Sequence, residues 1–248
     1  MQVRPYRWRL SGSFLAHLFK ATTQQHHRLL APVIARLVPS DGIVFDVGAH
    51  AGQFTKLFAR AAPAGHVYAF EPGSYARSIL RVVVAARRLG NVSVLPLALG
   101  AVPHLDTLTV PLKRRGSVGF GLAHFGAPQP RWAQVAQEVV ATTTVDTVVE
   151  TLALDRLDLI KADIEGWELR LLHGARAALE RFRPRLMLEL ADAHLARAGD
   201  RVSDAFGFLE GLGYRAFEGL PGHGFVPVAA PHDGDFWFLP AGDSLIAC

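Results

Sequence analysis

Short apolar runs alternate with helical segments along most of the chain, and this alternation limits the possible folds more than any other feature. The runs read GIVFDV, HVYAFEP, VSVLPLAL, LDLIKAD and RLMLEL, and they begin at residues 42, 66, 92, 157 and 185. A continuous apolar run of this length is typical of a strand that is buried on both faces. Apolar residues at helical spacing between the runs, such as Phe54, Leu57 and Phe58, predict crossover helices. The pattern therefore predicts an α/β fold with an open, mostly parallel sheet and helices on both faces.

The two ends of the chain carry patterns that differ from this central alternation. Near the C-terminus, YRAFEG and DFWFLP predict an antiparallel strand pair, which brings the expected sheet to seven strands. In residues 11–38, apolar residues at helical spacing predict a helix in two pieces, which Pro32 breaks or bends. We therefore expect a helical appendage over residues 1–40 and one α/β domain over residues 41–248.

Composition and charge limit the possible partners and compartments. The 26 basic and 22 acidic residues leave a net charge of +4, and the arginines are scattered, which favours a solvated surface over a nucleic-acid interface. The only cysteine is Cys248, so we expect no disulfide framework or zinc site, and a cytoplasmic location. No window reaches the length of a membrane span, and His17 and Lys20 interrupt the apolar stretch that a signal peptide would need. An amphipathic helix packed on the domain is the favoured interpretation of the N-terminal arm, and a peripheral membrane contact is the weaker alternative.

The first apolar run ends in the loop Asp46-Val47-Gly48-Ala49-His50-Ala51-Gly52, the place where nucleotide sites of such folds begin. Gly48 permits a tight turn and a close ligand approach, and Gly52 permits a helix to pack closely on the strand. The loop lacks the third glycine of the G-x-G-x-x-G fingerprint, and no Gly-Lys-Ser/Thr follows it as in a P-loop. The carboxylate of Asp46 would repel a pyrophosphate, whereas it would attract the ammonium group of an amino acid. The loop therefore favours S-adenosylmethionine over NAD.

A second carboxylate, Glu71, ends the next apolar run, 23 positions after Gly48. A carboxylate at this position can accept hydrogen bonds from both hydroxyl groups of a ribose. The alternative is that Asp46 and Glu71 merely cap neighbouring helices. Two acidic strand ends with the glycines between them favour the cofactor site over this alternative.

Five segments together resemble the FkbM-type methyltransferases, a family of class I enzymes that depend on S-adenosylmethionine. These segments, FDVGAHAGQFT, HVYAFEP, LPLALG, TTTVDTVVE and LIKADIEGWELRLLHGA, fall within residues 40–240. The D-x-E-G-W-E motif that begins at Asp163 and the T-x-D motif at Thr144 and Asp146 are the most specific. The resemblance implies a Rossmann-like methyltransferase domain and O-methylation of a hydroxyl on a sugar, a glycolipid or a polyketide-like natural product. It also implies cofactor contacts at Asp46, Gly48, Ala49, His50, Gly52, Glu71, Pro72, Ala98 and Asp163.

Methyl transfer to an alcohol requires removal of the hydroxyl proton, so a general base or a metal ion assists the reaction. Asp163 and Glu165, at the end of the fourth run, are the first candidates for a base or for a magnesium site. The alternative is that these carboxylates and Glu168 only favour the positive end of the following helix. After the fifth run come the second candidates, Glu189 as a further metal ligand and His194 as a base, with a surface histidine as the favoured alternative for His194.

The sequence thus predicts an S-adenosylmethionine-dependent O-methyltransferase that acts on a small-molecule hydroxyl acceptor. A nucleic-acid methyltransferase is a rival interpretation, although Asp163-Ile164-Glu165-Gly166 replaces the Asn/Asp-Pro-Pro-Tyr/Phe motif of amino-directed base methylation. A non-catalytic binding or scaffold subunit with the cofactor fold is the other rival. The irregular stretch 101–139 is short, so one alternative is a homodimer in which the second subunit completes the substrate pocket. Within that stretch, His124 is interpreted as a loop residue in preference to a pocket residue.

Overall fold

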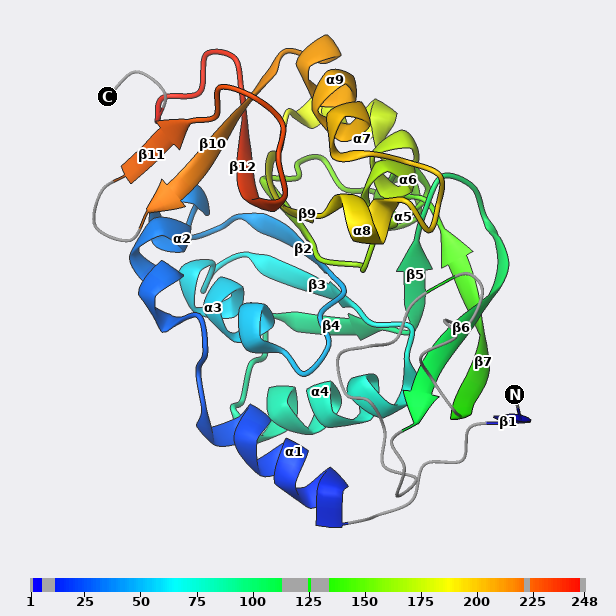
Figure 1. The fold of residues 1–248 in the computed structure, drawn as a ribbon. Helices are drawn as coiled ribbons and strands as arrows, with labels where there is room; N and C mark the ends of the chain where they lie inside the picture. The colour runs from blue at the N-terminus through cyan, green and yellow to red at the C-terminus, as the bar shows by residue number, and fades with distance from the viewer. Residues whose placement is uncertain (1, 6–11, 113–124, 126–133, 221–223, 246–248) are drawn as a thin grey trace.

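The computed structural model describes residues 2–5, 12–112, 125, 134–220 and 224–245. Within these residues the main sheet has eight strands in the order β11-β10-β12-β9-β8-β2-β3-β4 (Figure 1). Strands β9, β8, β2, β3 and β4 run parallel, whereas β12, β10 and β11 are antiparallel to their neighbours. The bounds are β2 (Ile43–Val47), β3 (His66–Phe70), β4 (Val92–Leu95), β8 (Leu159–Ala162), β9 (Arg185–Leu190), β10 (Tyr214–Leu220), β11 (Gly224–Pro227) and β12 (Gly234–Pro240). The predicted mostly parallel sheet is confirmed, with β10 and β12 as the expected C-terminal pair and β11 as one additional strand.

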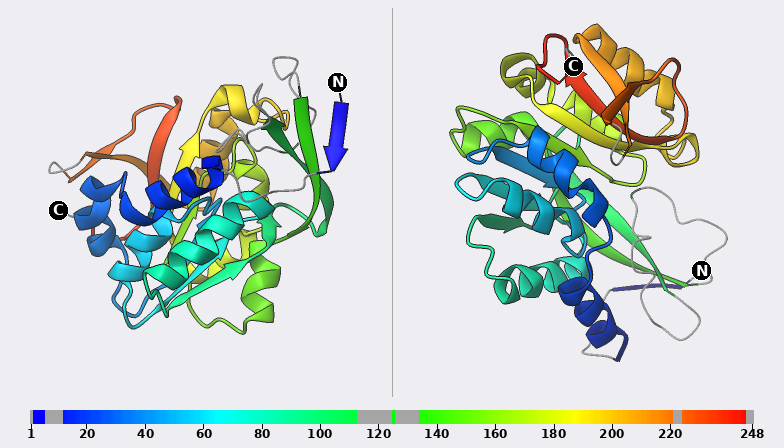
Figure 2. Two further views of the ribbon diagram at one scale, coloured as in Figure 1. Left: turned by 90° about the horizontal axis from the view of Figure 1, so that it is seen from below. Right: turned by 90° about the vertical axis from the view of Figure 1, so that its left-hand side faces the viewer.

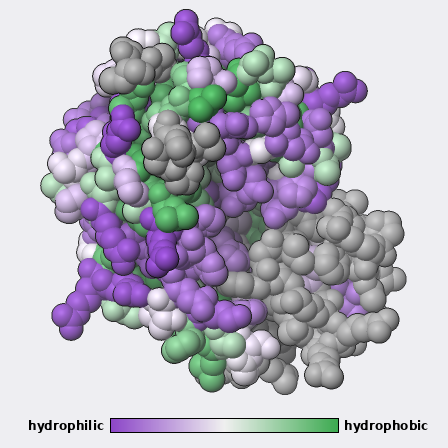
Figure 3. Space-filling view, turned by 60° about the vertical axis from the view of Figure 1, so that its left-hand side comes forward, coloured by the Kyte–Doolittle hydropathy of each residue, from purple (hydrophilic) through white to green (hydrophobic). Residues whose placement is uncertain are grey.

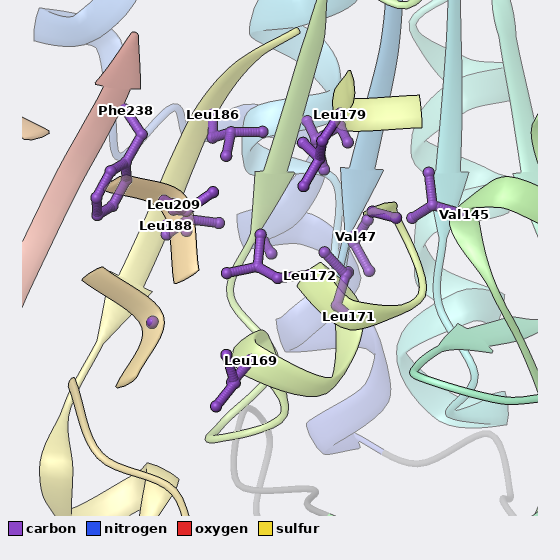
Figure 4. Close-up of a cluster of buried hydrophobic side chains, with 14 of the residues drawn as sticks. Val47, Val145, Leu169, Leu171, Leu172, Leu179, Leu186, Leu188, Leu209 and Phe238 are labelled. Carbon is purple, nitrogen blue, oxygen red and sulfur yellow. The ribbon is translucent and has the colours of Figure 1, made fainter. Parts of the chain in front are cut away.

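Helices cover both faces of this sheet, as the alternation of the apolar runs predicts. One face carries α1 (Gly12–Thr23), η1 (Arg28–Leu30), α2 (Ala31–Leu37), α3 (Gln53–Ala61) and α4 (Ser74–Ala86). The other carries α5 (Val145–Thr151), α6 (Glu168–His173), α7 (Arg176–Phe182), the short α8 (Asp192–Leu195) and α9 (Val202–Gly211). Successive side chains of a strand point to opposite faces. Val44 therefore packs in the core under α2 and α3, whereas Phe45 and Val47 pack in the core under α5 to α9, part of which Figure 4 shows.

A second sheet stands at one side of the domain (Figure 2). It consists of β1 (Gln2–Pro5), β5 (Leu97–Leu99), β6 (His104–Leu112) and β7 (Gln134–Thr143), and β7 pairs with each of the other three. The sequence predicts one strand over VSVLPLAL, but the structure divides this run at Pro96 into β4 of the main sheet and β5 of the second sheet. Proline has no N–H for a ladder hydrogen bond, so it is a natural point for the chain to change sheets.

The N-terminal segment also differs from its predicted form in detail. Pro32 does not break a helix there, because it lies in the first turn of α2, where a missing N–H is tolerated. The interruption falls earlier, between the end of α1 at Thr23 and the start of η1 at Arg28. Helix α1 packs against α4 through Phe14, whose ring meets that of Tyr75 edge-on at 5.6 Å. Within the described part of the chain, every helix is too short or too polar to span a bilayer.

Candidate active site

The glycine loop joins β2 to α3 at the carboxyl edge of the sheet. The N–H groups of Gly48 and Ala49 both donate to the Phe70 carbonyl at the end of β3, at 3.0 Å each. Gly48 has φ +71°, and a Cβ atom there would lie 2.1 Å from the backbone oxygen of Asp163. Gly52 has φ +81°, and a Cβ atom there would lie 2.7 Å from the side chain of Leu80 on α4. The Asp163 backbone therefore requires glycine at position 48, whereas at position 52 the positive φ angle favours glycine.

Glu71 lies directly after β3 and faces this loop. One carboxylate oxygen accepts a hydrogen bond from the N–H of His50, and the other accepts one from the N–H of Gly73, both at 2.8 Å. Each oxygen keeps a lone pair that a ligand hydroxyl can use. Burial raises the pKa of Glu71 to about 7, although both backbone hydrogen bonds favour the charged form. Burial also lowers the pKa of His50 to about 4, so this imidazole is neutral at pH 7.

The chain after Glu71 is also held in place. Arg77 on α4 donates to the backbone carbonyls of Glu71 and Pro72, at 3.0 and 2.5 Å. The predicted cofactor residue Pro72 is thus adjacent to Glu71 in a fixed segment. Ala98, another predicted cofactor residue, is buried in β5 among apolar side chains of the second sheet.

Asp46 is fully buried behind the glycine loop, and its partners are protein groups. The Thr55 hydroxyl donates to one carboxylate oxygen at 2.5 Å, and the Lys161 ammonium lies 3.7 Å from the other. Burial raises the pKa of Asp46, and the positive charge of Lys161 opposes this effect. Lys161 also donates to the carbonyls of Val47 and Gly48, at 3.3 and 3.2 Å. The sequence leads us to expect direct attraction of a ligand ammonium by Asp46, whereas the structure places this carboxylate against Thr55 and Lys161.

Three carboxylates stand in a row on neighbouring strands at this edge of the sheet. Asp235 on β12 pairs in register with Glu189 on β9, and Asp163 follows Ala162, whose partner on β9 is Leu188. The carboxyl groups of Asp163 and Glu189 lie close enough for a protonated one to donate to the other. Burial, and then the charge of Asp163, raise the pKa of Glu189 to about 8. At neutral pH the two carboxylates therefore hold one proton between them.

A pocket of about 330 Å³ opens over this row of carboxylates. Its charged lining consists of Asp163, Glu189, Asp235 and Lys161, and its aromatic lining consists of His27, Phe54 and Trp237. The His27 and Phe54 rings are stacked with centroids 4.4 Å apart, and Lys161 lies 5.3 Å from the Phe54 centroid. Hydrogen-bonding groups between aromatic walls are suited to a polar small molecule with an apolar face.

Glu165 and His194 are brought together, but outside this pocket lining. The His194 ring lies 3.4 Å from the Glu165 carboxylate, and Arg197 approaches the same carboxylate oxygen at 3.5 Å. Glu165 has φ +58° and Gly166 has φ +105°, so the chain turns sharply here. A Cβ atom on Gly166 would lie 2.2 Å from the His194 carbonyl oxygen, which explains the glycine. The structure thus places Glu165 and His194 in one cluster and Asp163 in another.

Glu168 holds the inside of that turn. It is buried, and its carboxylate accepts hydrogen bonds from the N–H groups of Ile164 and Gly166, at 2.9 and 3.3 Å. Burial raises its pKa to about 7. The T-x-D motif has a similar local use, because Thr144 caps α5 and Asp146 accepts from the N–H groups of Ala177 and Ala178. The D-x-E-G-W-E motif therefore fixes the turn after Asp163, whereas the T-x-D motif fixes the junction between α5 and α7.

A magnesium site on Asp163, Glu165 and Glu189 stays a prediction. Among the described residues, no group of three or more His, Cys, Asp or Glu side chains is arranged to hold a metal ion. Glu165 is engaged by His194 and Arg197, while Asp163 and Glu189 hold one proton between them. His124 lies outside the described residues.

Sequence reasoning missed two charged residues of the pocket, Lys161 and Asp235, and also its aromatic lining. The signal for Lys161 is visible in LDLIKAD, since a lysine inside a fully buried strand needs a charged partner. Asp235 is the first residue of the apolar run DFWFLP, and its position beside Glu189 depends on the antiparallel register of β12 with β9. No local pattern reveals that register.

Residues 46–216 match a family model described as a methyltransferase FkbM domain. No curated protein matches the chain. Among solved structures, an FkbM methyltransferase from Methylobacillus flagellatus KT aligns with TM-score 0.51 and 13% identity over 91% of this chain, which spans 59% of that protein. An O-methyltransferase from Bacillus cereus, in complex with SAH, aligns with TM-score 0.50 and 13% identity over 93% of this chain and 91% of its own. At these identities the likeness establishes the fold.

Proposed function

The chain belongs to the FkbM methyltransferase family, and from this premise we propose that it transfers the methyl group of S-adenosylmethionine to a hydroxyl of a small molecule. The Bacillus cereus structure of similar fold holds SAH, the product that this donor leaves. The acceptor class that we propose is a sugar, a glycolipid or a polyketide-like natural product. Methyltransferase activity is inferred from the family match, whereas the identities of the methyl donor and the acceptor are what we propose.

The observation that carries the donor assignment is the geometry of Glu71. Two backbone N–H groups hold its carboxylate beside the glycine loop, and each oxygen can still accept a hydroxyl donor, as the two ribose hydroxyls require. We assign the cofactor contacts to the loop from Gly48 to Gly52, including Ala49 and His50, and to Glu71, Pro72, Ala98 and Asp163. Asp46 acts through Lys161, whose hydrogen bonds to the Val47 and Gly48 carbonyls fix the loop. The bound donor supplies an electrophilic methyl group on a sulfonium centre.

We place the acceptor in the pocket over β8, β9 and β12. Its Asp163–Glu189 pair takes the proton of the acceptor hydroxyl and keeps it on a carboxylate oxygen, which is general base catalysis. The aromatic side chains of Phe54 and Trp237 orient the acceptor and exclude water. Glu165 and His194 serve as positioning residues, because their contact and the turn at Gly166 set where Asp163 points.

Glu71→Gln should weaken SAH binding by about 100-fold, because two hydrogen bonds to a charged acceptor become bonds to a neutral one. Isothermal calorimetry measures this directly, and Glu150→Gln on the exposed side of α5 is the matched control. Because the pKa of Glu71 is about 7, SAH binding should also depend on pH. The SAH affinity of the parent should fall about tenfold from pH 8 to pH 6, as Glu71 gains a proton. The variant should lack this dependence. Equal affinity in parent and variant at both pH values would remove Glu71 from the donor site.

The acceptor side has its own pH signature. Because the pKa of Glu189 is about 8, the Asp163–Glu189 pair loses its proton as pH rises through 8 and becomes a stronger base. We therefore expect kcat/KM to rise from pH 7 to pH 9, measured as tritiated methyl transfer from labelled donor to a panel of hydroxyl-bearing acceptors. Glu189→Gln should flatten this rise. A rise of the same size in the variant would assign the titration to another group.

A further inference from the structure

Charge is divided unequally between the first and second parts of the sequence. Residues 1–105 contain twelve arginines and lysines but only three acidic residues, which are Asp41, Asp46 and Glu71. Residues 106–248 contain fourteen basic and nineteen acidic residues. Asp46 and Glu71 are buried, and Asp41 forms an ion pair with Arg156. A charge asymmetry of this size points to a charged surface as partner.

The fold converts this asymmetry along the sequence into an asymmetry between two faces. The helices α1, η1, α2, α3 and α4 share one face of the main sheet, and none of these described helices contains an aspartate or a glutamate. We call this helical layer the basic face. Its exposed cationic side chains are Lys20, Arg28, Arg36, Arg60 and Arg81. On the opposite face, α5, α6, α7 and α9 each carry at least one acidic residue.

Large apolar side chains are exposed on the same basic face. Leu15 and Phe19, one helical turn apart on α1, are 58% and 67% exposed, while Phe14 and Ala21 bury the other side of that helix against α4. Leu29 in η1 is 66% exposed and Val82 in α4 is 42% exposed. In Figure 3, hydrophobic and hydrophilic side chains stand side by side at the lower end of the view, the end at which α1 lies in Figure 1. Helix α1 thus has two apolar sides: one is buried against α4 and the other is exposed to solvent.

We propose that the basic face docks on an anionic lipid surface, with α1 lying in the interface. Exposed cationic side chains attract anionic headgroups, and Leu15 and Phe19 can enter the boundary between headgroups and acyl chains. The aliphatic side chains of Leu15, Leu29 and Val82 favour lipid over nucleic acid, since a phosphate backbone offers them no apolar partner. His27 and Leu30, beside and within η1, line the acceptor pocket, so docking brings that pocket close to the lipid surface.

Cosedimentation of the full chain with vesicles tests this proposal. We expect the protein to sediment with vesicles of phosphatidylcholine and phosphatidylglycerol, to stay in solution with phosphatidylcholine alone, and to be released by high salt. Two double variants should each weaken partitioning by about tenfold or more. One combines Lys20→Glu with Arg81→Glu, and the other combines Leu15→Ser with Phe19→Ser. Arg176→Glu with Arg181→Glu makes the same charge change at exposed positions of α7, on the opposite face of the sheet, and should have little effect.

Three outcomes would overturn the proposal. The first is no sedimentation with anionic vesicles at low salt, and the second is an equal loss in the control pair. The third is binding to single-stranded RNA without binding to vesicles, which would assign the basic face to nucleic acid. The four substituted positions of the basic face are not among the proposed donor contacts, so the variants should keep their SAH affinity. If the protein fails to bind vesicles but still binds SAH, the docking proposal is wrong and the proposed methyl transfer is unaffected.

Discussion

Lys161→Met should lower the free energy of unfolding by about 3–5 kcal/mol, which is the usual cost of removing one partner from a buried ion pair. Lys161 is 3% exposed, and its ammonium lies 3.7 Å from Asp46, which is fully buried. Methionine fills a similar volume, so the loss comes from the uncompensated carboxylate and not from a cavity. The variant also removes the hydrogen bonds to the Val47 and Gly48 carbonyls that hold the glycine loop. Urea denaturation measures the effect as a lower midpoint at unchanged slope.

Two controls isolate the role of the ion pair. Asp46→Asn combined with Lys161→Met removes both charges, so it should recover most of the stability that the single variant loses. Lys56 is equally buried, but its ammonium donates to the Ala21 and Gln24 carbonyls and forms no ion pair within the described residues; burial lowers its pKa to about 8. Lys56→Met leaves no buried carboxylate behind and should cost less than Lys161→Met. A Lys161→Met protein as stable as the parent would show that Asp46 is held by other means.

The sequence alone was sufficient for the central architecture, because the apolar runs that form β2, β3, β8 and β9 are local patterns. Burial on both faces gives each of these strands a continuous apolar run, and a crossover helix of apolar periodicity follows each of the first two. The second sheet was not predictable in the same way. It joins β1, β5, β6 and β7 from distant parts of the chain, and the change of sheet at Pro96 falls inside a run that looks continuous. Pairings of this kind depend on tertiary contacts that no short window contains.

The same distinction applies to the candidate site. Glu71 and Asp163 could be selected from sequence, because the ends of parallel strands meet at one edge of the sheet. The pairing of Asp163 with Glu189 needed the register of β8 against β9, and the separation of Glu165 from the pocket needed the positive φ angles at Glu165 and Gly166. Asp46 stands out in the sequence as a carboxylate before the first glycine of the loop, but its charged partner Lys161 lies in the adjacent strand β8. Neighbouring strands, and not neighbouring residues, decide the electrostatics of this site.

Asp163→Asn should reduce turnover by about 10²–10⁴-fold while SAH affinity changes only a few-fold. The asparagine keeps the size of the side chain and can still hydrogen-bond to Glu189, but it cannot take the hydroxyl proton. The loss should appear in kcat, because proton transfer belongs to the chemical step and not to the binding of donor or acceptor. Methyl transfer from labelled donor gives the rate, and calorimetry with SAH gives the affinity.

Asp155→Asn is the matched control, since it makes the same chemical change at an exposed position just before β8 and should leave both readings unchanged. A comparison with Glu165→Gln then separates the two carboxylate clusters. If Asp163 is the base and Glu165 only positions it, Glu165→Gln should slow turnover less than Asp163→Asn and should keep the rise of kcat/KM through pH 8. An active Asp163→Asn enzyme together with an inactive Glu165→Gln enzyme would move the base to the Glu165–His194 cluster, and the acceptor would then have to bind on that side of the turn.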